Sequence, residues 1–294
     1  MKPLKKEDIK QEVFDLYDAY AHNKLERRDF VQKLSMYAVG GLTVPSLMSF
    51  LMPDYENTFL VDKNNPDLDS GFITYNSDKG GGEINALLSK PKSAEGKLPG
   101  IVVVHENRGL NPYVEDTARR AALAGFITIA PDALSPLGGY PGNDDEGRAM
   151  QRKRDRNDML EDFIAAFDYL KNHEDCNGKI GVVGFCFGGW ISNMMAVKVS
   201  DLSAAVPFYG GQPTEGIENI NAPLMLQYAG LDERVNAGWP AYEKALNELG
   251  KENVAYFYDN VNHGFHNTST PRYDEPAAEL AWSRTIDFFK KKLV

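Results

Sequence analysis

The stretch Ile180-Gly181-Val182-Val183-Gly184-Phe185-Cys186-Phe187-Gly188-Gly189 decides the fold of this chain. Its first four residues are typical of a buried parallel strand, and the residues from Trp190 onward predict a helix. A strand, a sharp turn flanked by glycines and a helix form a nucleophile elbow, which lifts the central side chain clear of the sheet. Serine is usual at the centre, whereas this chain has Cys186. A thiol at that position attacks a carbonyl only as the thiolate, with a base beside it.

Strands and helices alternate on both sides of this stretch. Residues 72–75 and 84–88, joined through a run of glycines, predict an antiparallel pair of strands. The continuous apolar strands that follow alternate with helices, which indicates a mostly parallel sheet of about eight strands with helices on both faces. The further strands expected are residues 101–104, 126–130, 180–183, 204–209, 224–229 and 254–258, and the expected helices are residues 114–123, 148–172, 190–198, 239–249 and 276–292.

The composition limits the classes of partner. The chain has 294 residues and a net charge of −10, which argues against nucleic acid and anionic membranes as partners. A disulfide between its two cysteines, Cys176 and Cys186, would consume the candidate nucleophile. The sequence has neither a glycine-rich phosphate loop nor a Cys/His cluster with zinc spacing. We therefore expect no metal and no organic cofactor.

Residues 1–68 predict a helical extension in front of an α/β domain that spans residues 69–294. Apolar residues recur at helical spacing between Ile9 and Tyr20. Residues 27–52, which begin with paired arginines and continue as an uncharged run, resemble a twin-arginine export signal. A charged helix precedes them, however, and no Ala-x-Ala cleavage site follows. We favour a retained pair of packed helices, with Pro45 breaking the second one.

These two interpretations of the extension predict different locations. An export signal directs the chain to the periplasm, whereas a retained extension fits the cytoplasmic location that we favour. Gly40, Gly41 and Pro45 dilute the apolar run, so we expect no stable membrane anchor. A further hypothesis is that the apolar stripe of the extension mediates formation of a homo-oligomer.

Three polar residues follow predicted strands at the edge where α/β sheets hold their active sites. They are Cys186 after residues 180–183, Asp232 after residues 224–229 and His263 after residues 254–258. The chain order of nucleophile, acid and histidine is that of the α/β-hydrolases and predicts this fold class. Each residue also has a structural interpretation: Cys186 as a buried apolar filler, Asp232 as a helix cap and His263 as a loop histidine.

The chemistry of an acyl transfer assigns a role to each member of this set. His263 accepts the proton of the nucleophile and returns a proton to the leaving alkoxide, while Asp232 holds the imidazole tautomer. The backbone N–H of Phe187 is the expected oxyanion donor, and a second donor is expected from the loop after residues 101–104. His22 is expected at the surface, away from this chemistry.

Four motifs carry a resemblance to a known family. They are the Gly-x-Cys-x-Gly-Gly elbow, His105-Glu106 after a strand, Asp232 after Gly-Leu, and Asn262-His263-Gly264-Phe265. Together, across residues 71–294, the chain resembles the dienelactone hydrolases (carboxymethylenebutenolidases). The resemblance implies that Cys186, Asp232 and His263 form the triad and that the Asn107 N–H is the second oxyanion donor. It also implies that Glu106 interacts with the resting thiol and helps to create the thiolate when substrate binds.

The substrate contacts depart from the family pattern. Members that act on dienelactone hold its carboxylate with arginines, one of them four residues after the histidine, where this chain has Asn267. Arg148 is the nearest candidate for another arginine, and Arg108 in the oxyanion loop is a further anion contact. The interpretation that we favour is that Arg148, Arg152, Arg154 and Arg156 form a solvated basic face of a helix.

We therefore expect a cysteine-dependent carboxylic ester hydrolase that cleaves a small-molecule ester or lactone through a thioester acyl-enzyme. One alternative is a thioesterase or general carboxylesterase that uses the same triad. The other is a hydrolase-like scaffold that binds a ligand or partner without turnover.

Overall fold

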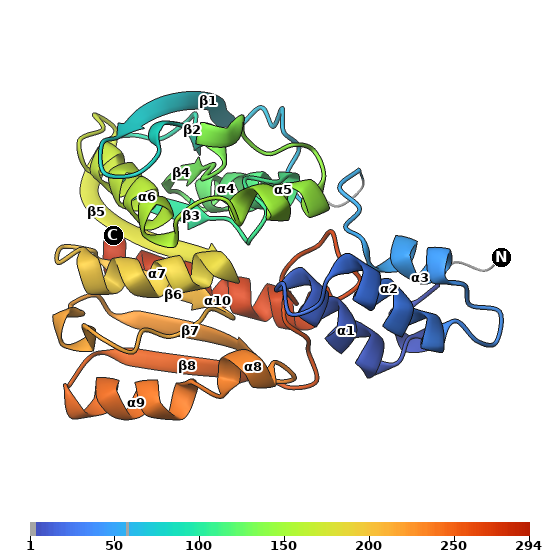
Figure 1. The fold of residues 1–294 in the computed structure, drawn as a ribbon. Coiled ribbons are helices and arrows are strands. Elements are labelled where there is room, and N and C mark those ends of the chain that lie inside the picture. The colour runs from blue at the N-terminus through green and yellow to red at the C-terminus, as the bar shows by residue number, and fades with distance from the viewer. Residues whose placement is uncertain (1–3, 57–58) are drawn as a thin grey trace.

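A mixed eight-stranded sheet forms the centre of the computed structural model, which describes residues 4–56 and 59–294 (Figure 1). The strand order is β1-β2-β4-β3-β5-β6-β7-β8. β2 pairs antiparallel with β1 and β4, and all other neighbours are parallel. The predicted α/β-hydrolase fold is confirmed. The strands are β1 Leu68–Ser77, β2 Gly82–Pro91, β3 Leu98–Val104, β4 Ile127–Pro131, β5 Cys176–Phe185, β6 Ala204–Phe208, β7 Leu224–Ala229 and β8 Asn253–Tyr258.

Helices cover both faces of the sheet because its central strands are apolar on both faces. In β3, Val102 and Val104 belong to the core on the face covered by α6, α7 and α9, whereas Ile101 and Val103 belong to the core on the face covered by α4 and α10. This division follows from the two-residue period of a strand, which sends successive side chains to opposite faces. The helices of this part are α4 Pro112–Leu123, α5 Asp144–Gln151, α6 Arg156–Lys171, α7 Phe187–Lys198, α8 Glu233–Asn236, α9 Trp239–Glu248 and α10 Glu275–Leu293.

The helix expected over residues 148–172 is two helices. α5 ends at Gln151 and α6 begins at Arg156. Asp155 lies between them in an extended conformation, and its carboxylate accepts hydrogen bonds from the N–H groups of Asn157 and Asp158. An aspartate in this position is a favoured N-cap, so a new helix starts here instead of continuing the old one.

The N-terminal extension consists of α1 Gln11–Ala21, α2 Arg27–Leu34 and α3 Val44–Leu51. These helices share an apolar cluster of their own, which includes Phe30, Leu34, Leu47 and Leu51. The prediction that Pro45 breaks a helix is wrong. Pro45 lies in the first turn of α3, where its missing N–H costs nothing. No helix of the described residues is long and apolar enough to cross a membrane.

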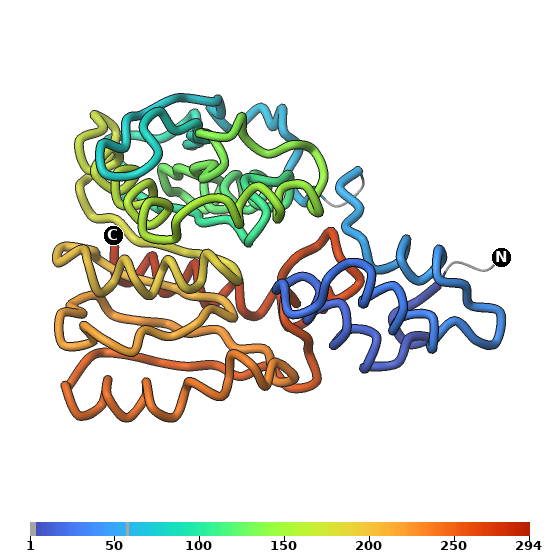
Figure 2. Tube along the Cα trace, viewed as in Figure 1, coloured from blue at the N-terminus to red at the C-terminus, as the bar shows by residue number. Residues whose placement is uncertain are grey.

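The extension lies beyond the carboxyl ends of the parallel strands (Figures 1 and 2). Polar contacts join it to the loops at that edge. The Arg148 guanidinium donates to the Tyr20 carbonyl at 3.2 Å and lies 3.9 Å from the centre of the Tyr20 ring. Gln11 and Asn262 exchange side-chain hydrogen bonds. The extension is therefore positioned over the edge where the candidate site residues gather.

Glycines allow β5 and α7 to approach their neighbours closely at the elbow. A Cβ on Gly184 would collide with the carbonyl of Gly188, and one on Gly188 would collide with the carbonyl of Val104 at the end of β3. A Cβ on Gly189 would meet the carbonyl of Phe208 at the end of β6. The glycines around Cys186 are thus required by backbone packing as well as by the turn.

We predict that Gly188→Ala lowers the free energy of unfolding by about 2–3 kcal/mol, because the Val104 carbonyl belongs to a central strand and cannot move aside. Gly71→Ala is the matched control, since Gly71 in β1 has open space around its Cβ position. That variant should change stability by less than about 0.5 kcal/mol. Chemical denaturation followed by fluorescence measures both values, and equal midpoints for the two variants would contradict the proposed packing constraint.

Candidate active site

Cys186 lies at the junction of β5 and α7 with a backbone of φ 58° and ψ −110°. A positive φ is uncommon for a residue with a side chain and marks a strained turn. The strain is held by hydrogen bonds on both sides: the Cys186 N–H donates to the Phe208 carbonyl at 3.1 Å, and the Gly189 N–H donates to the Cys186 carbonyl at 3.0 Å. The turn places the thiol at the carboxyl edge of the sheet with 8% of the residue exposed.

Asp232 and His263 meet at the same edge, from the loops after β7 and β8. The Nδ1–H of His263 donates to Oδ2 of Asp232 at 2.5 Å. Oδ1 of Asp232 accepts the N–H of Val235 at 3.1 Å and so caps α8. One carboxylate therefore fills both roles that the sequence left open, helix cap and imidazole partner.

The second ring nitrogen of His263, Nε2, is buried, has no hydrogen-bond partner among the described residues and is the atom that can exchange a proton with the thiol. A ring nitrogen of His263 lies within 4.8 Å of Cys186 Sγ. His266, the nearby histidine that could be confused with it, is instead buried against Tyr113, whose hydroxyl lies 2.7 Å from its Nδ1. The structure therefore places His263, and not His266, beside the thiol.

Glu106, from the loop after β3, is buried in the same region. Its Oε2 accepts a hydrogen bond from Asn267 at 2.8 Å, so the residue that replaces the family's arginine contacts the carboxyl group of Glu106. Burial raises the pKa of Glu106, an effect opposed first by the charge of Arg108 and strengthened by that of Cys186. The hydrogen-bonding partner of the thiol is a different residue.

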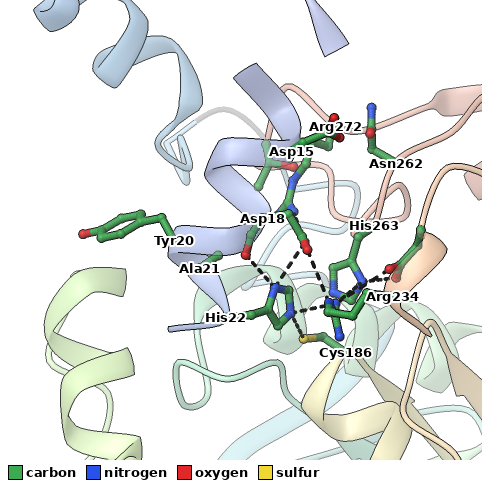
Figure 3. A network of polar contacts seen from close by, with 12 residues as sticks. Asp15, Asp18, Tyr20, Ala21, His22, Cys186, Arg234, Asn262, His263 and Arg272 are labelled. Carbon is green, nitrogen blue, oxygen red and sulfur yellow. Dashed lines mark hydrogen bonds and ion pairs between the residues drawn. The ribbon is translucent and has the colours of Figure 1, made fainter. Parts of the chain in front are cut away.

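That partner is His22, which the sequence placed at the surface; this expectation is wrong. Its Nε2 lies 3.2 Å from Cys186 Sγ, and its side chain is 15% exposed (Figure 3). His22 caps the C-terminus of α1, and its ring lies edge-on to that of His263 with centroids 4.6 Å apart. No signal near His22 in the sequence predicts this contact, because 164 positions separate it from Cys186.

Arg234 is a second residue of the site that the sequence did not single out. Its guanidinium lies 3.5 Å from the carboxylate of Asp18 and 3.8 Å from that of Asp232. Nη2 of Arg234 lies 3.3 Å from Nε2 of His22 and 3.2 Å from Nδ1 of His263. Arg234 thus links the carboxylates on the two sides of the imidazoles.

The two expected oxyanion residues are Phe187, which follows Cys186 in the chain, and Asn107, in the loop after the neighbouring strand β3. Phe187 is the first residue of α7, so its N–H belongs to the unsatisfied first turn of that helix. Asn107 follows Glu106, and its side-chain amide donates to the Ala21 carbonyl at the end of α1, at 2.7 Å. His105 is buried, and its Nε2 accepts the N–H of Ala133 at 3.1 Å, which fits a structural role.

The expected substrate arginines differ in their surroundings. Arg108 is buried in an ion pair with Asp144. Arg148 is paired with Asp145 at 3.1 Å and also holds Tyr20 of the extension. Both guanidinium groups are therefore engaged within the protein, and neither belongs to a solvated basic face.

Two hollows border residues of the site. One, of about 450 Å³, separates α1 from the catalytic loops and is lined by Asp18, Asp232, Arg234 and His263 among others. The second, of about 280 Å³, borders the expected oxyanion residues Asn107 and Phe187. Four arginines line this second hollow: Arg148, Arg152, Arg154 and Arg156.

His22, Cys186 and His263 also form a set of the kind that binds zinc, with one ligand atom from each within 4.8 Å of the others. The Arg234 guanidinium, however, lies 3.3 Å from the nitrogen that His22 would offer. A fixed positive charge repels a divalent ion at that distance about twice as strongly as it repels a singly charged imidazolium. The arrangement is therefore better suited to proton chemistry than to a metal.

Electrostatic interactions in the site favour a thiolate. Burial would raise the pKa of the Cys186 thiol, but the charges of His22 and His263 outweigh it and lower that pKa well below its ordinary value. Burial would lower the pKa of His263, but Asp232 and then Cys186 raise it to about 10. Burial would raise the pKa of Asp232, but the charge and hydrogen bond of His263, together with the charge of Arg234, lower it. Thiolate and imidazolium stabilise each other.

This fold, with a cysteine elbow and an acid–histidine pair at the carboxyl edge of the sheet, defines an α/β-hydrolase. Residues 84–293 match the model of the dienelactone hydrolase family, and the chain belongs to that family. It is accordingly a hydrolase that acts on esters or lactones. Residues 1–40 match a separate model, described as YqhI-like.

Relatives and solved structures agree with this membership. The protein Usf of Aquifex pyrophilus is 34% identical over 74% of this chain and 96% of its own length. A Saccharolobus solfataricus protein named "Putative carboxymethylenebutenolidase" is 28% identical over 74% of this chain and 97% of its own. Among solved structures, the dienelactone hydrolase of Anabaena variabilis has a TM-score of 0.59 at 19% identity, covering 78% of this chain and 100% of its own. That likeness shows the shared fold.

We predict that Asp232→Asn lowers kcat/KM for ester hydrolysis by about 10³-fold, because an amide does not hold the Nδ1–H tautomer of His263. Asparagine is as good an N-cap as aspartate, so α8 should remain capped in this variant. Glu233→Gln, at the next position of α8, is the matched control and should retain activity. Equal rates for the two variants would exclude the Asp232–His263 pair from the chemistry.

Proposed function

We propose that the protein is a cysteine-dependent hydrolase that cleaves an ester or lactone through a thioester acyl-enzyme, with Cys186, His263 and Asp232 as its triad. The observation that carries this proposal is the position of the thiol on a strained elbow, within 4.8 Å of a histidine that is bonded to a buried carboxylate. A thiolate at that position faces a bound carbonyl, and an imidazolium beside it supplies the proton that the leaving group needs.

In the proposed first step, His263 has taken the thiol proton and the Cys186 thiolate attacks the carbonyl carbon. The oxyanion lies between the N–H groups of Phe187 and Asn107, where the first turn of α7 adds a favourable dipole. The intermediate collapses with loss of the alkoxide, which takes the proton from His263. Water then attacks the thioester, His263 accepts its proton, and the thiolate is released with the acid.

Glu106 has a supporting role in this proposal. Its raised pKa, caused by burial, favours a neutral carboxyl group beside the thiolate. A neutral Glu106 adds no negative charge next to Cys186, whereas an ionised one would disfavour the thiolate. Asn267 holds the carboxyl group in place through its hydrogen bond.

The arginines beside the oxyanion residues favour a substrate with an anionic group. Arg156 lies 3.8 Å above the Trp190 ring and forms no ion pair with a described residue. Arg148 and Arg156 both line the hollow of about 280 Å³ that Asn107 and Phe187 also border, whereas Arg108 does not line it. A carboxylated ester or lactone would therefore find cations close to the thiol, and Arg148 remains the better candidate contact of the two arginines that the sequence suggested.

We predict that Cys186→Ser lowers kcat/KM by at least about 100-fold on lactones, oxygen esters and thioesters, because a serine hydroxyl ionises far less readily than the thiol. A panel containing dihydrocoumarin, p-nitrophenyl acetate and an acyl thioester measures this loss and ranks the substrate classes. Preference for the thioester would favour the alternative thioesterase. Full activity of the serine variant throughout the panel would rule out thiolate chemistry.

Mass spectrometry of the intact protein distinguishes the enzyme from a binding scaffold. With a slowly hydrolysed ester we expect a mass increase equal to the acyl group, located on the peptide that contains Cys186. Cys176→Ser is the matched control and should still form the adduct. Absence of both adduct and turnover would favour the scaffold.

We predict that kcat/KM falls as the pH rises through about 10, the raised pKa of His263. The imidazolium is present below this value and is lost above it, and the thiolate loses its proton donor at the same point. On the acid side activity persists below the ordinary pKa of a thiol, because the pKa of Cys186 is lowered. Rates corrected with Cys186→Ala as the blank measure both limbs, and an alkaline limb near pH 7 would contradict the assignment.

A further inference from the structure

The thiol of Cys186 has a second acid–imidazole pair on the side that faces the extension. Asp18 lies in α1, and His22 follows one helical turn later, so both side chains lie on the same face. Nδ1 of His22 is 2.9 Å from the Asp18 carbonyl oxygen and 3.1 Å from its Oδ1. Both oxygens are acceptors, so the hydrogen lies on Nδ1 and Nε2 faces the sulfur, 3.2 Å away. Figure 3 shows His22 and His263 next to each other at Cys186, with Asp18 beside His22.

The arrangement repeats that of Asp232 and His263. In each pair a carboxylate oxygen lies within 3.1 Å of Nδ1, and Nε2 is left towards the nucleophile. In the second pair the hydrogen bond of Nδ1 goes to the backbone carbonyl of Asp18, and the carboxylate acts through its charge. Asp18 is held in turn by Arg234 at 3.5 Å and by the buried Arg272 at 3.6 Å. A positioned carboxylate behind an imidazole stabilises its protonated form, and that protonated form stabilises an adjacent thiolate.

We infer that His22, oriented by Asp18, is a second catalytic imidazole that the N-terminal extension contributes to the active site, where its protonated Nε2 holds Cys186 as a thiolate. This inference rests on the proposed function and deepens it. His263 moves the proton between nucleophile, leaving group and water, whereas His22 keeps its proton throughout. The covalent steps and their proton balance are those given above, with ester and water yielding alcohol and acid.

The charges that face the thiol support this division of roles. The thiolate, Asp18 and Asp232 are negative, and the protonated forms of His22 and His263 are positive, as is Arg234, so these groups balance. Three further ionisable groups face this cluster: Glu106 from the loop after β3, Arg272 from the loop before α10 and Arg156 from α6. The positive charge of Arg272 lowers the pKa of Glu106 and so opposes the effect of burial on it. Burial would lower the pKa of His22, and the charge of His263 acts in the same direction. The Cys186 charge, with the interactions with Asp18 and Cys186, outweighs both and raises that pKa.

Anchoring of the extension does not account for His22. Other residues already tie α1 to the rest of the molecule, among them Asn107, which binds the Ala21 carbonyl, and Arg148, which binds the Tyr20 carbonyl. An anchor has no need of a carboxylate behind the imidazole or of the nucleophile in front of it.

The test measures ionisation of the thiol without substrate. The rate of Cys186 alkylation by iodoacetamide is recorded against pH in the full-length protein, with Cys176→Ser as the background. For His22→Gln we expect the profile to move to higher pH by at least about one unit, and kcat/KM at neutral pH to fall by about 10- to 100-fold. Asp18→Asn should move the profile in the same direction by less. Glu12→Gln, on the exposed side of α1, is the matched control and should leave profile and rate unchanged.

His22→Lys separates charge from packing, because lysine restores a cation without the ring. We expect its alkylation profile to lie closer to that of the parent than the profile of His22→Gln does. An unshifted profile in His22→Gln, with normal turnover through Cys186, would overturn the inference and leave the proposed function intact. A shifted profile without ester turnover by the parent would instead refute the proposed function, and with it the catalytic role of His22.

Discussion

The close approach of β5, α7 and the neighbouring strands β3 and β6 is the constraint on which the active site depends. Glycines at 184, 188 and 189 let the backbones approach so closely that no Cβ fits between them. This packing forces Cys186 into a positive φ, and that conformation is what lifts its thiol above the sheet. It also brings the start of α7 to the thiol, so that the helix N–H groups and the nucleophile share one side of the elbow.

Because β3, β5, β7 and β8 run parallel, their carboxyl ends lie at one edge, and the loops after them bring Glu106, Cys186, Asp232 and His263 together. The charges gathered there are largely buried. Such a set is stable only when opposite charges alternate, and here carboxylates, imidazoles and guanidinium groups follow one another in space. The lowered pKa of the thiol and the raised pKa of His263 are two expressions of this alternation.

The extension and the active site are coupled through the same charges. Within the extension, α1, α2 and α3 pack through apolar side chains, but towards the sheet edge α1 presents Asp18 and His22. Arg234 links Asp18 to Asp232 across the junction. Removing the extension would therefore expose the thiol and also take away part of the charge balance that surrounds it.

The elements that were predicted correctly are those with strong local patterns. Apolar runs identified the strands, and the glycines around Cys186 identified the elbow. The helix expected over residues 148–172 was wrong because the capping ability of Asp155 outweighs the continuity of the helical pattern. The prediction that Pro45 breaks a helix was wrong, because the effect of a proline depends on its position in the helix. Pro45 lies in the first turn of α3, where a proline is favourable.

The sequence by itself determined the α/β-hydrolase fold and the elbow, because each depends on local patterns within single strands, turns and helices. It also determined the order of cysteine, aspartate and histidine, because each of them directly follows a recognisable strand. Only the tertiary structure showed that His22 contacts the thiol and that Arg148 binds the extension. It also showed that Asp232 both caps α8 and accepts a hydrogen bond from the His263 imidazole. The physical reason is that a side chain's role depends on the charges within a few ångströms of it. Those charges come from loops and helices that are far apart in sequence and meet only when the sheet and the extension pack together.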